Sequence, residues 1–105
     1  MKILERSSIT ISYKKPFIDW NNNLTPELAL NISMLGESKT YLTKVDFENA
    51  DQLIKKYFKE IFELELDGTW TDENDWPQNR DFSTFCDWFN FEISDWVTDL
   101  EKKKL

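Results

Sequence analysis

Apolar and polar residues alternate strictly near the start of the chain, in the segment SITISYK at residues 8–14. The apolar side chains of this segment are Ile9, Ile11 and Tyr13, and a β-strand places all three on one face. The alternation therefore predicts a half-buried strand, which Pro16 ends.

The next eight residues, FIDWNNNL, have no clear period. We expect their large side chains, Phe17, Ile18 and Trp20, to point inward. The run of asparagines that follows is typical of a turn.

Two further segments, LALNISML at residues 28–35 and KTYLTKV at residues 39–45, also alternate. Three residues that include a glycine separate them, and this arrangement predicts a β-hairpin. A helix over residues 26–35, with Thr25 as its cap and Pro26 in its first turn, is the alternative. We favour the strand.

From Asn49 to Asp67 the apolar period becomes that of a helix. Asp46 or Asn49 can cap its first turn, and Gly68 can supply the left-handed residue that follows its last turn. A stripe this wide favours burial under other elements over display of a flank to a partner. The stripe consists of Ala50, Leu53, Ile54, Tyr57, Ile61 and Leu64, widened by Phe58, Phe62 and Leu66.

A shorter helix is predicted over residues 82–89, with Asp81 as its cap. Its inner face is formed by Phe82, Phe85, Cys86 and Phe89, which are three or four positions apart. Cys86 is therefore expected to be a buried, inert thiol.

Beyond Asn90 the period returns to two, and this predicts a last strand. Asp95 interrupts the pattern and could mark a bulge, the end of the strand, or an inward-facing carboxyl with a raised pKa. We favour a bulge or an early end. In this strand Phe91, Ile93 and Val97 alternate with Glu92, Ser94 and Trp96.

The predicted order of elements is β-β-β-α-α-β, in which strands are followed by helices. Such an order predicts the α+β class, with an antiparallel sheet of about four strands and two helices packed on one face. The length fits one globular domain over residues 1–105, with a frayed basic tail at residues 101–105. We expect the last strand to pair with one of the first three.

Composition narrows the possible chemistry. The chain has no histidine, one cysteine and two glycines, which removes histidine-based catalysis, the usual zinc sites and a glycine-rich phosphate loop. No cofactor and no metal is expected.

The N-terminal segment lacks the apolar core of a signal peptide, and no apolar run approaches the ~20 residues of a membrane span. These features, together with the lone thiol, predict a cytoplasmic protein that does not enter membranes.

Charge is distributed unevenly. Residues 1–59 carry a net charge of +2, residues 60–101 carry −12 with Arg80 as their one basic residue, and Lys102, Lys103 and Lys104 add +3, for a total of −7. Such an acidic half repels nucleic acid and favours a partner protein with a basic surface. The alternative is that the acids only keep an aromatic-rich protein in solution.

The most acidic and least regular segment is DGTWTDENDWPQNR, residues 67–80. Asp72, Glu73 and Asp75 could form a carboxylate pair for general acid–base catalysis or a loose cation site, although the spacing does not match an EF-hand. This small enzyme or divalent-cation-binding protein is our second functional hypothesis.

Two tryptophans in this segment, Trp70 and Trp76, allow two interpretations. Both can turn inward and hold the segment against the helices, with Arg80 paired to a carboxylate or stacked on an indole. Alternatively one tryptophan stays exposed, and the segment then forms an interface. Tryptophan and arginine anchor protein interfaces, and an acidic rim suits a basic partner.

Residues 70–100, together with SITISYKKPFIDW at residues 8–20, resemble a family of small bacterial proteins of about this length. The resemblance rests on the tryptophan pair, the Trp-Pro dipeptide, Arg80 and the run of Phe82, Phe85, Trp88 and Phe89. The family has no assigned activity. The resemblance therefore implies a bacterial origin and contributes no catalytic residue.

These observations favour a non-catalytic protein-binding module, inhibitor-like or immunity-like, that acts on a basic partner and is a monomer or a homodimer. Its candidate contact residues are Trp70, Asp72, Glu73, Asp75, Trp76 and Arg80. A third hypothesis is a self-associating structural protein that dimerises through Phe58 and Phe62.

Overall fold

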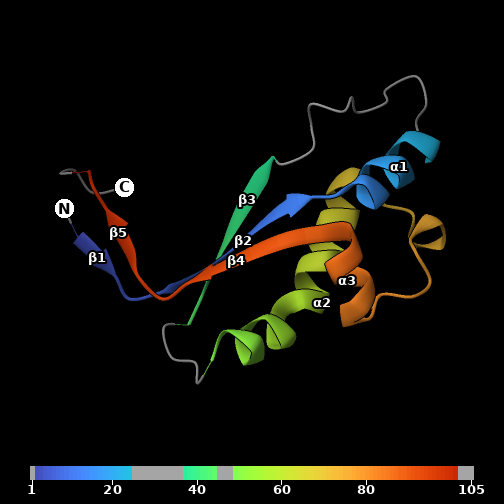
Figure 1. Cartoon of the computed structure of the whole chain (residues 1–105). Coiled ribbons are helices and arrows are strands. Elements are labelled where there is room, and N and C mark those ends of the chain that lie inside the picture. Colours follow the sequence, from blue (N-terminus) through green and yellow to red (C-terminus); the bar gives the residue numbers. More distant parts are fainter. Residues whose placement is uncertain (1, 25–36, 45–48, 102–105) are drawn as a thin grey trace.

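The computed structural model describes residues 2–24, 37–44 and 49–101, and these residues form an α+β structure (Figure 1). The helices are α1 (Lys15–Leu24), α2 (Ala50–Thr69) and α3 (Phe82–Trp88), with one 3-10 turn, η3 (Glu73–Asp75). The strands are β1 (Lys2–Leu4), β2 (Ser7–Tyr13), β3 (Ser38–Thr43), β4 (Phe89–Ser94) and β5 (Val97–Asp99). The predicted fold class is confirmed, although the order of elements is wrong because α1, β1 and β5 were not anticipated.

Strand β2 is the centre of an antiparallel three-stranded sheet with the order β3-β2-β4. Ile9 of β2 pairs with Tyr41 of β3 and with Ile93 of β4. The prediction that the last strand pairs with one of the first three is therefore confirmed, with β2 as its neighbour.

Strands β1 and β5 pair antiparallel as a separate two-stranded ribbon, which projects from the body of the molecule (Figure 1). Residues 5–7 separate the paired positions Leu4 and Ser8, whereas only two residues separate Ser94 and Val97 on the opposite strand. The connection is thus one residue longer on one strand than on the other, and the ribbon and the three-stranded sheet are separate sheets.

The favoured interpretation of Asp95 is therefore confirmed. Strand β4 ends one residue before it, at Ser94, and the side chain of Asp95 is exposed rather than turned inward.

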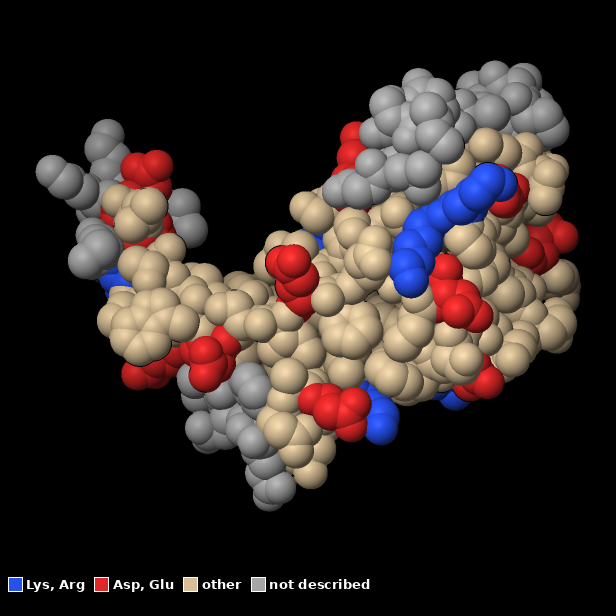
Figure 2. Space-filling view, viewed as in Figure 1, with Lys and Arg blue, Asp and Glu red and all other residues tan. Residues whose placement is uncertain are grey.

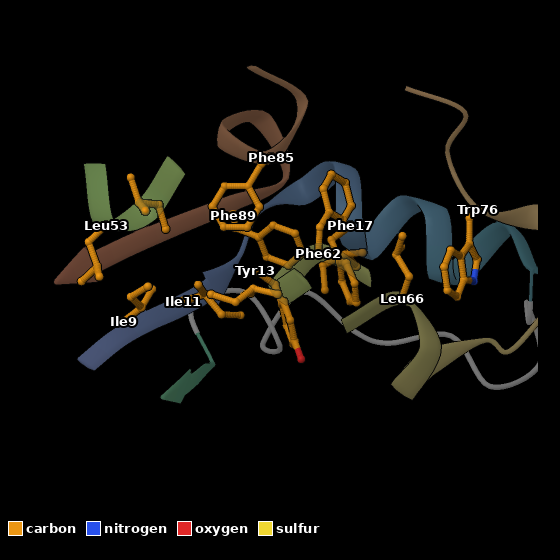
Figure 3. Close-up of a cluster of buried hydrophobic side chains, with 13 residues drawn as sticks. Ile9, Ile11, Tyr13, Phe17, Leu53, Phe62, Leu66, Trp76, Phe85 and Phe89 are labelled. Atoms are coloured by element: carbon orange, nitrogen blue, oxygen red, sulfur yellow. The ribbon is translucent and has the colours of Figure 1, made fainter. Parts of the chain in front are cut away.

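One side of the sheet, which we call the inner face, carries the hydrophobic core (Figure 3). Phe62 of α2 and Phe85 of α3 place their ring centroids 5.4 and 5.1 Å from that of Phe89 on β4. Both predicted helices thus pack on the same face. Helix α1 adds Phe17, whose ring stacks on Tyr13 at 4.3 Å.

Helix α1 replaces the turn that the asparagine run predicted. Pro16 lies in its first turn, where a missing N–H costs no hydrogen bond. Phe17, Ile18 and Asn21 are buried on one side of the helix. This burial outweighs the low helix propensity of asparagine, because tertiary packing overrides a weak local preference.

The predicted starts of the two later helices are confirmed. The side chain of Asn49 accepts a hydrogen bond from the N–H of Gln52 at 2.8 Å at the start of α2. The carboxylate of Asp81 accepts one from the N–H of Thr84 at 2.8 Å at the start of α3.

The predicted end of α2 is wrong. The helix continues through Gly68 to Thr69, and Trp70 is its C-cap in an extended conformation. Gly68 is therefore an interior helical residue. The apolar stripe also shifts in this half of the helix, because Leu64 is 50% exposed whereas Glu65 and Leu66 are buried.

Several predictions lie outside the described residues. They are the strand at 28–35 and its helical alternative from Pro26, the hairpin that depends on them, the cap Asp46, and the tail after residue 101. The strand predicted at 39–45 is β3, and it pairs with β2.

Candidate functional site

Three indole N–H groups donate hydrogen bonds to the predicted site segment. Trp76 donates to the carbonyl of Trp70 at 2.7 Å, and Trp70 donates to the carboxylate of Asp75 at 3.0 Å, so both bonds lie within the segment. Trp20 of α1 donates to the carbonyl of Asp75 at 2.9 Å and ties the segment to the body. Trp76 is buried and Trp70 is half-buried.

The acidic side chains of this segment accept hydrogen bonds from groups within the segment itself. Asp72 caps the turn η3 by accepting from the N–H of Asn74 at 3.0 Å, and Asp75 accepts from Trp70. Asp72, Glu73 and Asp75 are exposed to water rather than enclosed in the apolar pocket that general acid–base catalysis needs. In the described part of the chain, no three acidic or cysteine side chains gather into a set that could hold a metal ion.

Arg80 also makes contacts within this segment. Its Nη1 donates to the carbonyl of Pro77 at 2.8 Å, and its guanidinium lies 5.7 Å from the ring centroid of Trp76. The Nε atom is 4.0 Å from the carboxylate of Glu63. The structure thus brings the six predicted contact residues together in one segment, where Trp76 is buried and Trp70 and Arg80 are half-buried.

The predicted aromatic dimer surface on α2 is not available. Phe62 is fully buried beneath α3 and β4, and Phe58 is half-buried, with its ring centroid 5.3 Å from that of Phe82. Cys86 is half-buried rather than fully buried. Burial raises the pKa of its thiol, which disfavours the reactive thiolate.

A buried carboxylate was missed by the sequence analysis. Glu65 of α2 is 1% exposed, and its carboxylate accepts hydrogen bonds from the hydroxyls of Tyr13, at 2.8 Å, and Tyr41. The ammonium of Lys39 lies 3.1 Å from the same group. The signal in the sequence is the position of Glu65, which is four residues after Ile61 on the apolar side of the helix.

The side of the sheet away from the helices was missed as well. Residues opposite each other in an antiparallel sheet point to the same side, so the register groups Leu42, Ser8 and Ser94, and likewise Thr40, Thr10 and Glu92. The hydroxyls of Thr10 and Thr40 are 2.9 Å apart and hydrogen-bonded. A third row, of Ser38, Ser12 and Asn90, completes this side.

The ribbon adds apolar side chains next to this surface. The indole N–H of Trp96 donates a hydrogen bond of 3.1 Å to the hydroxyl of Thr98, so these two side chains lie together. Ile3 is paired with Thr98, and paired residues of an antiparallel ribbon point to the same side. We call these twelve residues the outer face: Ser38, Thr40, Leu42, Ser8, Thr10, Ser12, Asn90, Glu92, Ser94, Ile3, Trp96 and Thr98.

The large apolar side chains of the outer face are unusually accessible. Trp96 is 67% exposed, Leu42 is 56% exposed and Ile3 is 52% exposed, and Leu100 just beyond β5 is also exposed. Leu42 and residues 2–6 line one open hollow of about 460 Å³, so the ribbon and the sheet form a continuous surface there. Figure 2 shows an uncharged band of surface from the ribbon onto the body, with acidic side chains along its margins.

The sequence already contained a sign that Trp96 lies on an exposed side of its strand. The period of two already placed Trp96 on the same side as the polar Glu92 and Ser94. A tryptophan on the polar side of a strand is a candidate surface anchor, because that side faces water.

Within the described part of the chain, none of the helices combines the length and the apolar character that a bilayer-spanning helix requires. Comparison with known proteins finds no matching family model, no matching curated sequence and no matching solved structure. The resemblance to a family of small bacterial proteins therefore stays a prediction.

Proposed function

We propose that this protein is a non-catalytic protein-binding module that contacts its partner through the outer face. The observation that carries the proposal is the exposure of Trp96, Leu42 and Ile3 where the ribbon adjoins a side of the sheet that carries mostly hydroxyl groups. Tryptophan is enriched among the residues that dominate binding energy, and large exposed apolar side chains gathered on one surface mark interaction sites.

The geometry also limits the entropy that binding would cost. The indole of Trp96 is already oriented by its hydrogen bond to Thr98. A side chain that is held in one rotamer before binding loses less conformational entropy when a partner covers it. This pre-organisation favours a recognition role for Trp96.

A basic partner that contacts the acidic body is a second candidate, and the net charge of −12 over residues 60–101 supports it. In this inhibitor-like or immunity-like function, the exposed carboxylates of Asp72 and Glu73 would provide electrostatic steering. The indoles of the same segment would act only as its scaffold.

Affinity retention with matched variants tests both candidates. The immobilised protein is presented with a mixture of proteins at low salt, beside Trp96→Ser and Leu64→Ser. Leu64 is the control, because it is an exposed apolar residue on α2, outside the outer face. We expect the Trp96 variant to lose retained polypeptides that the Leu64 variant keeps.

Equal retention by the two variants would show that the outer face is not the binding surface. The double variant Asp72→Asn, Glu73→Gln then tests the acidic segment. A loss of retention confined to this variant would favour the basic partner over the outer face.

A further inference from the structure

Strand β3 is held to the helices differently from the other strands of its sheet. Among the described residues, β2 and β4 contribute side chains such as Ile11 and Phe89 to the buried apolar core, whereas β3 contributes none (Figure 3). Strands β3 and β4 both flank β2, so the difference does not come from their position in the sheet. Burial of apolar area stabilises a core, and it therefore fixes β4 more firmly than β3.

The contacts of β3 with the helix layer are polar. Its side chains on the inner face are Lys39, Tyr41 and Thr43, because Tyr41 is paired with the buried Ile9. The hydroxyl of Tyr41 donates to Oε2 of Glu65 on α2, and the ammonium of Lys39 lies 3.1 Å from Oε1 of the same carboxylate. These two contacts tie β3 to α2.

The remaining hydrogen bond of the Glu65 carboxylate comes from a different strand. The hydroxyl of Tyr13 on β2 donates to Oε1 at 2.8 Å. If β3 moved away, Oε1 would keep this hydrogen bond and water would hydrate Oε2 in place of Tyr41. Hydration of a carboxylate offsets part of the free energy of the lost contacts, so polar contacts hold a strand less firmly than buried apolar area does.

From the absence of β3 side chains in the buried core and from the two contacts at Glu65, we infer that β3 opens separately from the rest of the described fold. Glu65, with Tyr41 and Lys39, is the latch that closes it. Segments with few buried apolar contacts open locally at a lower free energy than the core of a protein. The inference is independent of the proposed function, because it uses no residue of the outer face.

Opening of β3 would change what the sheet presents to other molecules. Strand β2 would become an edge strand, with unpaired backbone groups along Ser7–Ser12, the residues that pair with β3 in the closed form. Such an edge can pair with another strand. The latch at Glu65 therefore controls whether this side of β2 is covered.

Backbone amide hydrogen exchange of the full chain at neutral pH tests the inference, with β4 as the internal reference because it flanks the same strand. The amides that bond to β2 are compared in the two strands. We expect those of β3 to exchange at least about tenfold faster, with rates that depend weakly on low concentrations of urea, because a local opening exposes little surface. The amides of β4 should show the stronger urea dependence of more extensive unfolding.

Two matched variants remove the same kind of hydroxyl from the same carboxylate, one from each strand. Tyr41→Phe breaks the latch and should accelerate exchange in β3 by about tenfold, the effect of losing a hydrogen bond to a charged group. Tyr13→Phe removes a hydrogen bond that stays in place when β3 opens. It should accelerate exchange in β4, because it lowers the overall stability, and it should affect β3 much less.

Equal acceleration of β3 by the two tyrosine variants would overturn the inference, since β3 would then exchange only when the whole fold opens. One shared urea dependence for β3 and β4 in the unaltered chain would overturn it as well. Lys39→Met is a second test of the latch that does not depend on the folding of Tyr41→Phe, because 54% of the Lys39 side chain is exposed. It should accelerate exchange in β3, and an unchanged rate there would contradict the role of Glu65.

Discussion

At the scale of single residues, Glu65 shows how a buried charge is accommodated in this core. Two tyrosine hydroxyls and one ammonium group satisfy its carboxylate, and they come from two adjacent strands that lie across α2. A buried carboxylate without such partners would cost several kcal/mol. The cluster of Glu65, Tyr13, Tyr41 and Lys39 therefore fixes α2 against β2 and β3.

The pH dependence of stability follows from this cluster. Burial and the hydrogen bond to Glu65 raise the pKa of both Tyr13 and Tyr41 above the ordinary value of 10.0. Burial alone would lower the pKa of Lys39, but its contacts with Tyr13 and Glu65 outweigh burial and raise it. The folded protein therefore keeps these protons to higher pH than the unfolded chain does, so stability is full below about pH 10 and is lost above it.

We expect the free energy of unfolding in urea to fall as the pH rises above about 10. Tyr41→Phe should make that fall shallower, because one of the raised groups is gone. Tyr57→Phe is the control, since Tyr57 lies two turns before Glu65 on the same helix. A steeper fall in the Tyr41 variant than in the Tyr57 variant would contradict this assignment.

The tryptophans differ in role, and this difference can be measured. Trp76→Phe removes the hydrogen bond to the carbonyl of Trp70 and weakens the cation–π contact with Arg80. It should lower the free energy of unfolding by about 1–2 kcal/mol.

Trp96→Phe should leave stability nearly unchanged and remove the emission that iodide quenches most readily, because Trp96 is the most exposed of the described indoles.

Urea unfolding and iodide quenching of the two variants check this, at a protein concentration low enough to keep the chain monomeric. Loss of the quenchable emission in Trp76→Phe instead would mean that the segment around it opens to solvent.

At the scale of the secondary-structure elements, a substitution at Gly68 tests the conformation of the last turn of helix α2. It lies inside α2, and a Cβ at this position would meet no atom within 4 Å. Gly68→Ala should therefore raise the free energy of unfolding by about 0.5–1 kcal/mol, because alanine loses less backbone entropy in a helix. Thermal and urea unfolding measure the change. A destabilised variant would instead indicate the left-handed conformation that the sequence analysis expected.

The elements that the sequence predicts well are those with long periodic patterns. Helix α2 and strand β2 were recognised because many apolar positions support one period, and the caps Asn49 and Asp81 follow from local chemistry. Helix α1 was missed because its burial depends on packing against Trp88 and Phe89, which no local pattern reveals.

Strands β1 and β5 were missed for a different reason. Each is three residues long, too short to show a period, and their pairing joins the two ends of the chain. The exposed face of the ribbon depends on the pairing of Ile3 with Thr98, and a pairing register cannot be read from either strand alone. The candidate site in the sequence was therefore placed on the acidic segment, whose composition is conspicuous.

At the scale of the whole molecule, the charge layout separates the two possible kinds of partner. A partner bound at the outer face would meet mainly apolar and hydroxyl groups, because Glu92 is the one charged residue among the twelve described residues assigned to it. A complex of the acidic segment with a basic protein instead brings opposite charges together. Added salt screens the second interaction and changes the first little.

We therefore expect the dissociation constant of a partner bound through the outer face to change little as the salt concentration rises from about 20 to 500 mM, although the Debye length shrinks from about 20 Å to a few ångström. Apolar contact at Ile3 and Trp96 is not weakened by this change. Binding measured at several salt concentrations, with Trp96→Ser as the control, checks this. A dissociation constant that rises with salt would place opposite charges at the interface, and the acidic segment around Asp72 would then be the contact surface to test.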